Sequence, residues 1–145
     1  MKKTFAFLFI SSVLFTSFTN RNENFSATDI IGVWTTGDPT HLQTFHIKVF
    51  EKNGDYYNVG FENGVAIMSH RGKYEIVNNT QYSEHVTELW HKAVWDLRGK
   101  KFINQYKFSE DKKKLFLSGV VFSKDGKDSL KWEHVYRRVE IPVAD

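Results

Sequence analysis

The feature that most constrains the fold is an alternation of apolar and polar residues with a period of two, which recurs from Trp34 to the end of the chain. An apolar repeat at the spacing of an α-helix does not continue over a helical length anywhere in this part. Successive side chains of a β-strand point to opposite faces, so the period predicts strands with one buried face. Aromatic residues, which favour strands, make up 16% of the sequence. We therefore expect an all-β protein.

Turn residues divide the alternating region into hairpins. Asn53-Gly54, Asn63-Gly64, Asn78-Asn79 and Asp125-Gly126 tolerate the positive φ angles of tight turns. Successive hairpins predict an eight-stranded up-and-down antiparallel barrel, closed or half-open. The expected strands are Gly32 to Thr36, Gln43 to Glu51, Tyr56 to Phe61, Ala66 to Val77, Gln81 to Trp90, Lys101 to Phe108, Lys114 to Phe122 and Ser129 to Val139.

The N-terminus has the pattern of an export signal. Lys2 and Lys3 precede an uncharged apolar run over 4–18, which is shorter than the ~20 residues of a membrane-spanning helix. We expect a cleaved signal peptide (1–19), a flexible lead (20–28) and one barrel domain (29–143), with a helical turn over 25–31 capped by Thr28 or Asp29. The chain has no Cys, so neither a lipoprotein anchor nor a disulfide is possible. A periplasmic or secreted protein without stable membrane insertion is the prediction.

Charge argues against nucleic acid as a partner. The formal net charge is +3, and it falls to +1 without Lys2 and Lys3. The remaining basic runs, 98–101 and 112–114, lie where turn residues cluster and are expected to be solvated.

Three groups of residues carry a resemblance to a known family. They are Gly32-Val33-Trp34, then Gly72-Lys73-Tyr74 with Tyr82-Ser83-Glu84, and the C-terminal stretch 132–142 with Tyr136-Arg137-Arg138. This pattern resembles the lipocalin-like, calycin-type families of secreted bacterial proteins, including a domain of unknown function. The resemblance implies a barrel whose cavity holds a small molecule. It also implies a structural lock in which Gly32 and Trp34 close the base and an Arg on the last strand lies across the indole.

The alternation assigns residues of the last strand to faces. Trp132, His134, Tyr136 and Arg138 share the face expected to point inward, which makes Arg138 the partner of Trp34, or Arg137 if a bulge shifts the register. Similar reasoning gives the predicted ligand-binding residues: Tyr74, Tyr82, Glu84, Tyr106, His134 and Tyr136.

Glu84 is the predicted polar residue of most interest. If it faces inward it needs a partner, because an unpaired buried carboxylate costs several kcal/mol, and Arg138, Tyr136 or His134 could supply one. The alternative is that it faces water beside a Lys or Arg of an adjacent strand.

Catalytic and metal-binding patterns are weak. The six His residues include neither His-x-His nor His-Glu-x-x-His, so we expect no metal and no cofactor. Ser69 and His70 are sequence neighbours and should point to opposite faces, which argues against a nucleophile with its base. We therefore predict a non-enzymatic protein.

Three functional hypotheses follow. The first is an exported protein that binds a small hydrophobic or amphipathic molecule inside the barrel. The second is an interaction or structural module, alone or as a homodimer, whose barrel is filled by its own aromatic side chains. The third is an enzyme acting on a lipid or glycan, which a cluster of titratable groups in the barrel mouth would support.

Overall fold

The computed structural model describes residues 26–37, 44–62, 65–90, 97–123 and 126–140, and the expected signal peptide lies outside them. A 3-10 helix, η1 (Ala27–Ile30), precedes eight strands in this part of the chain. The strands are β1 (Gly32–Thr35), β2 (Thr44–Phe50), β3 (Asp55–Glu62), β4 (Val65–Asn78), β5 (Gln81–Leu89), β6 (Lys101–Phe108), β7 (Lys114–Phe122) and β8 (Ser129–Arg138). The predicted all-β fold with eight strands is confirmed.

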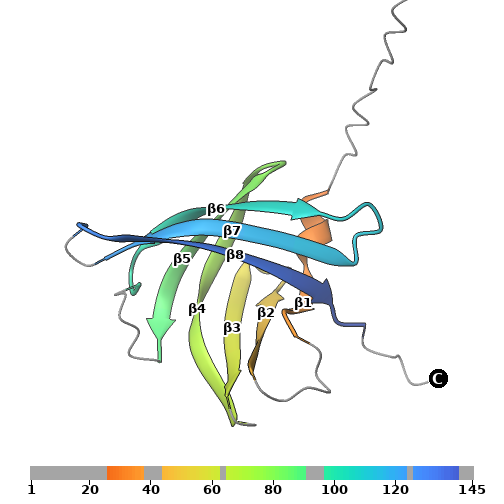
Figure 1. The fold of residues 1–145 in the computed structure, drawn as a ribbon. Coiled ribbons are helices and arrows are strands. Elements are labelled where there is room, and N and C mark those ends of the chain that lie inside the picture. Colours follow the sequence, from red (N-terminus) through yellow and green to blue (C-terminus); the bar gives the residue numbers. More distant parts are fainter. Residues whose placement is uncertain (1–25, 38–43, 63–64, 91–96, 124–125, 141–145) are drawn as a thin grey trace, which may run out of the picture.

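The strands form a closed antiparallel barrel in sequence order (Figure 1). Closure depends on a short contact between the first and last strands, in which Trp34 pairs with Arg138 and Thr35 with Arg137. The barrel is therefore closed, not half-open. No helix in the described segments is long and apolar enough to cross a lipid bilayer.

The predicted N-terminal helical turn is present, but its N-cap lies earlier than predicted. Ser26 is the N-cap, and its hydroxyl oxygen accepts a hydrogen bond from the backbone N–H of Thr28. Asp29 completes a capping box, since its carboxylate accepts from the N–H of Ser26 at 2.8 Å. The prediction of Thr28 or Asp29 as the N-cap was wrong because a Ser three residues before an acidic residue satisfies two orphan N–H groups at once. Residues 26–28, expected in the flexible lead, belong to this turn.

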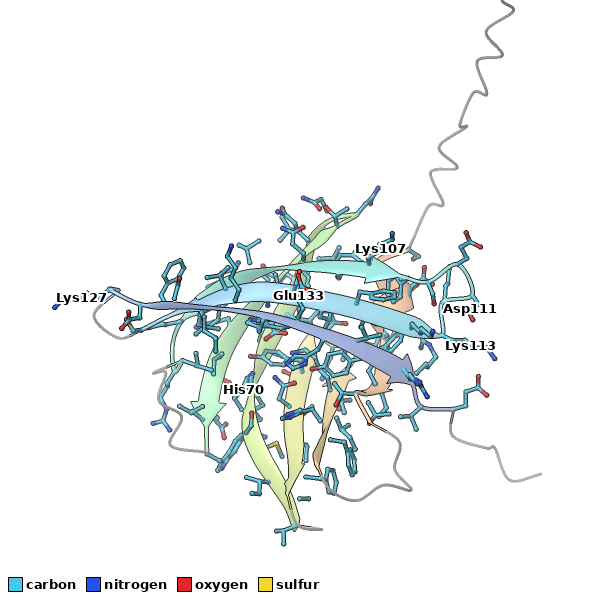
Figure 2. All side chains as sticks on the ribbon, viewed as in Figure 1. His70, Lys107, Asp111, Lys113, Lys127 and Glu133 are labelled. Atoms are coloured by element: carbon cyan, nitrogen blue, oxygen red, sulfur yellow. The ribbon has the colours of Figure 1, made fainter. Side chains whose placement is uncertain are left out.

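Alternation places the core inside the barrel. On β6 the side chains of Asn104, Tyr106 and Phe108 are buried, whereas those of Lys101 and Ile103 are exposed. The buried aromatic residues gather in the half of the barrel that contains η1 and the end of β8. That half is the base, and the opposite end, where the β7–β8 hairpin turns, is the mouth. Figure 2 shows Lys127 at the tip of that hairpin and Asp111 and Lys113 at the base end.

Three irregularities in the pairing of β4 shape the wall of the barrel. The register between β3 and β4 shifts after Asn58, which pairs with His70 while Val59 pairs with Met68. Ser69 is thus an extra residue, as in a β-bulge. The other two shifts lie on the β5 side of β4, one between Arg71 and Gly72 and one between Ile76 and Asn78.

Candidate ligand-binding cavity

The base of the barrel is closed by Trp34 and Arg138. Trp34 is fully buried, and its indole Nε1 donates a hydrogen bond to the carbonyl of Ile30 at 2.8 Å. The guanidinium carbon of Arg138 lies 4.2 Å from the centre of the indole ring. Its Nη1 and Nη2 donate to the carbonyls of Ile31 and Asp29 at 3.0 and 2.6 Å. One side chain therefore joins β8 to the N-terminal turn by cation–π attraction and hydrogen bonds.

Gly32 makes room for this arrangement. It has φ of +139°, and a Cβ at this position would lie 2.9 Å from Nη1 of Arg138. A larger residue would be strained by its backbone conformation and would crowd the guanidinium. The residues named for the lock thus lie together at the base, and Arg137 points away on the exposed face.

A cavity of about 210 Å³ occupies the mouth half of the barrel. It lies above the aromatic core, and every strand from β2 to β8 contributes to its lining. Polar and apolar side chains both face it: His46, Lys48, Asn58, Ser69, His70, Glu84, Val86, Leu97, Phe102, Asn104, Val121, Trp132, His134 and Tyr136.

An ion pair is buried at the inner part of this cavity. Lys48 Nζ lies 2.5 Å from Glu84 Oε1, and the side chains are only 3% and 6% exposed. The hydroxyl of Tyr82 donates to the same carboxylate oxygen at 2.8 Å. The lysine ammonium also lies 5.0 Å from the ring centre of Tyr56 and 5.5 Å from that of Phe50. Glu84 therefore faces inward, and its charged partner comes from β2.

A chain of hydrogen bonds continues from the ion pair toward the mouth. Lys48 Nζ donates to Asn58 Oδ1 at 3.3 Å. Since that oxygen accepts from the ammonium, Asn58 presents its Nδ2 to His70 Nε2, at 2.6 Å. His70 Nε2 must then accept, so the proton of the neutral ring is on Nδ1, which donates to Ser69 Oγ at 2.7 Å.

The Ser69–His70 contact corrects a prediction. The two side chains were expected on opposite faces, but the bulge after Asn58 brings both to the cavity. In the hydrogen-bond order above, His70 donates to Ser69 instead of accepting its proton. The serine is therefore not activated as a nucleophile in this arrangement.

Burial suppresses the ionisation of three side chains that line the cavity. Burial and the charge of Lys48 lower the pKa of His70 to about 4. Burial, His46 and Lys48 lower the pKa of His134 as well. Burial and the charge of Glu84 raise the pKa of Tyr136 above its ordinary value. Near pH 7 these three groups are neutral hydrogen-bonding groups.

The predicted ligand-binding residues divide into two sets. Glu84, His134 and Tyr136 line the cavity. His134 is exposed at the mouth, where its ring centre lies 5.9 Å from that of His46. The other three, Tyr74, Tyr82 and Tyr106, belong to the packed core, and none of them lines this cavity. The hydroxyl of Tyr74 donates a hydrogen bond to the backbone carbonyl of Glu51, and that of Tyr106 donates to the carbonyl of Asn78.

Sequence reasoning missed most of the polar lining. Lys48, Asn58, His70 and Asn104 were not predicted, although each lies on the inward face of its strand. The face of β2 was hard to assign because both of its faces carry large apolar residues, with Ile47 and Val49 on one and Phe50 beside Lys48 on the other. For Asn104 a signal was available, because it shares the buried face of β6 with Tyr106 by regular alternation.

The cavity can hold a neutral or amphipathic molecule by hydrogen bonds and ring contacts. In the described residues, no group of three or more His, Asp or Glu side chains is arranged to hold a metal ion. A family model described as a domain of unknown function, DUF4488, matches residues 29–145. No curated protein matches the chain.

Proposed function

The chain belongs to the DUF4488 family, and from that premise we propose that it is an exported, lipocalin-like binding protein that holds a small amphipathic molecule in the mouth half of its barrel. The resemblance to lipocalin-like proteins is part of this proposal. It is supported by the closed eight-stranded barrel and by Arg138 stacked on Trp34 at the base. Export is supported by the signal-like residues 1–19.

The observation that carries the proposal is the Lys48–Glu84 ion pair below an accessible cavity. Two buried charges are costly, and apolar residues of similar size often stabilise a core as well or better. A charged pair in a barrel interior is thus better explained by binding than by stability. The pair and the amide of Asn58 give the inner end of the cavity its polarity, while Phe102 and Trp132 give it apolar walls.

Cavity size limits the ligand. About 210 Å³ is below the ~300–1,000 Å³ that is typical of sites for drug-sized molecules. The expected ligand has a single ring or a similar small body, with hydroxyl, amide or carbonyl groups for the polar end. A sterol or a long acyl chain would not fit entirely inside.

An interaction module remains the second candidate, because one observation favours it. Phe116 and Val135 pair across β7 and β8 on the outer face, and both are exposed. Such neighbours could be covered by a partner protein or by a second copy of the chain.

The test compares the intact mass of the processed protein under native and denaturing conditions after expression with export and purification without detergent. A bound molecule gives a mass excess that is lost on denaturation. We expect Asn58→Leu to reduce this excess, whereas the outward-facing variant His85→Gln retains it. A native mass equal to that of the chain would contradict binding, and a doubled mass would favour the interaction module.

A further inference from the structure

The wall of the barrel separates between β6 and β7. These strands pair only from Gln105 with Ser118 to Phe108 with Leu115, within the described residues. Beyond that point the first half of β6 pairs with β5, and the last half of β7 pairs with β8. The β7–β8 hairpin consequently extends past the start of β6, as Figure 1 shows on the left of the view.

Gly119 lies where the strands separate. A Cβ at this position would overlap Oδ1 of Asn104, and it would lie 2.8 Å from the ring of Trp132. The side chains of Asn104 and Trp132 therefore lie against the face of Gly119 from which a Cβ would project, so only glycine fits at this position.

A groove of about 680 Å³ lies along this separation. Trp132 and Phe102, whose alternation places them on the inward face, contribute aromatic surface to it. Ile103 and Phe122 contribute apolar surface from the outer face and are 51% and 55% exposed. The groove is within the size range of small-molecule sites, and it is more than three times as large as the internal cavity.

The rim of the groove is basic. Lys100, Lys101 and Lys131 line it, against one carboxylate, that of Glu133. Lys101 is paired with Glu75 at 3.1 Å, but neither Lys100 nor Lys131 has an ion-pair partner in the part of the chain that the structure describes. Apolar walls beside unpaired ammonium groups complement a molecule with an apolar body and a negative head.

We propose that this groove is a second binding site, which takes one monomeric amphipathic anion such as a long-chain carboxylate. Its apolar body lies against Ile103, Phe122 and Trp132, and its head lies at Lys100 and Lys131. The site is separate from the internal cavity, with which it shares only Phe102 and Trp132. Binding here does not depend on the function proposed for that cavity.

The experiment is a calorimetric titration of the processed protein with dodecanoate below its critical micelle concentration. Dodecyltrimethylammonium, which has the same chain and the opposite charge, is the matched ligand control. We expect dodecanoate to bind and the cation to bind at least roughly tenfold more weakly. Added salt should weaken the binding of dodecanoate, since the lysines are at the surface.

Variants distinguish the groove from other sites. Lys100→Glu with Lys131→Glu should weaken dodecanoate binding at least roughly tenfold, and Ile103→Ser should weaken it through the apolar wall. Two control variants should bind dodecanoate with an affinity within about twofold of the parent protein. One is Lys107→Glu, at an exposed lysine of β6 outside the groove, and the other is the cavity variant Asn58→Leu. These groove substitutions are at accessible positions, and circular dichroism checks the fold of each variant.

Four outcomes would overturn the proposal. They are equal binding of anion and cation, unchanged binding by the Lys100 and Lys131 double variant, loss of binding in Asn58→Leu, and attachment to phosphatidylglycerol vesicles without binding of monomeric dodecanoate. Loss in Asn58→Leu would place the amphiphile in the cavity and support the function proposed there instead. If the protein shows no mass excess but still binds dodecanoate through Lys100 and Lys131, the groove proposal stands and the function proposed for the cavity is rejected.

Discussion

Lys48 and Glu84 form an ion pair across the interior of the barrel, with 2.5 Å between Nζ and Oε1, although their strands, β2 and β5, are not neighbours in the sheet. Closure of the barrel brings the two strands face to face. The pair is also hydrogen-bonded to Tyr82 and Asn58, so each charge has polar neighbours in addition to its partner. This satisfies the condition under which buried charges are tolerated.

Substituting one member of this pair should lower the free energy of unfolding more than substituting both. Lys48→Met leaves a buried, uncompensated carboxylate and should lower the free energy of unfolding by about 3–5 kcal/mol. The double variant Lys48→Met/Glu84→Gln should recover part of that loss, because neither charge remains. Urea denaturation of the parent, both single variants and the double variant gives the coupling energy. Additive losses would show that the two side chains are energetically independent.

Stability should depend on pH through His70. Its pKa is about 4 in the folded chain against an ordinary value of 6.5, so between these values the unfolded chain binds a proton that the folded chain does not. The free energy of unfolding should therefore fall as the pH is lowered from about 6.5 to about 4, by at most about 3 kcal/mol from this group. Protonation would also add an N–H at His70 Nε2, which would then face the N–H of Asn58 Nδ2, so two hydrogen-bond donors would meet.

Denaturation at pH values of about 4.5 and 7 measures this dependence. His70→Gln should reduce the difference, whereas His85→Gln, on the outer face, should leave it unchanged. His134 acts in the same direction, because its pKa is also lowered. Asp55 and Asp111 do not confound the window, since their lowered pKa values affect stability only below the ordinary 3.8. An identical pH dependence in His70→Gln would contradict the assignment.

The base lock should be a major source of stability. Trp34→Ala removes a fully buried indole together with its contact to Arg138, and it should lower the free energy of unfolding by about 3–5 kcal/mol. Trp90→Ala is the control, since Trp90 is 49% exposed, and it should cost no more than about 1 kcal/mol. Thermal unfolding measures both variants. Equal melting temperatures would reject Trp34 as the residue that closes the base.

Gly72 should tolerate no side chain. A Cβ there would overlap the carbonyl oxygen of His85, which is backbone and cannot rotate away. We expect Gly72→Ala to lower the free energy of unfolding by about 1–3 kcal/mol or more. Gly60→Ala is the matched control on β3, where the nearest atom to a new Cβ would be Nδ1 of His46 at 3.6 Å. If the two variants unfold at the same denaturant concentration, the close approach of β4 and β5 at Gly72 is wrong.

Local chemistry made the strands and turns predictable. The β2–β3 turn illustrates this, because Asn53 accepts from the N–H of Asp55 and Gly54 has φ of +83°. The inward face of β8 was predictable for the same reason, since a strand with regular pairing alternates strictly. The bulge at Ser69 was not, because the extra residue disturbs only the pairing with β3 and leaves no mark in the residue types.

The sequence by itself determined the number of strands and their order, because hydrophobic period and turn chemistry are local properties. The closure of the base by Trp34 and an Arg of the last strand was expected from the resemblance to lipocalin-like proteins, and the alternation selected Arg138. Only the tertiary structure decided which residues form the cavity. Lys48 and Glu84 meet because the sheet closes, and His70 faces Ser69 because one register shift turns both inward. These contacts join segments far apart in the chain or depend on a shift of one residue, and neither changes the alternation from which the strands were predicted.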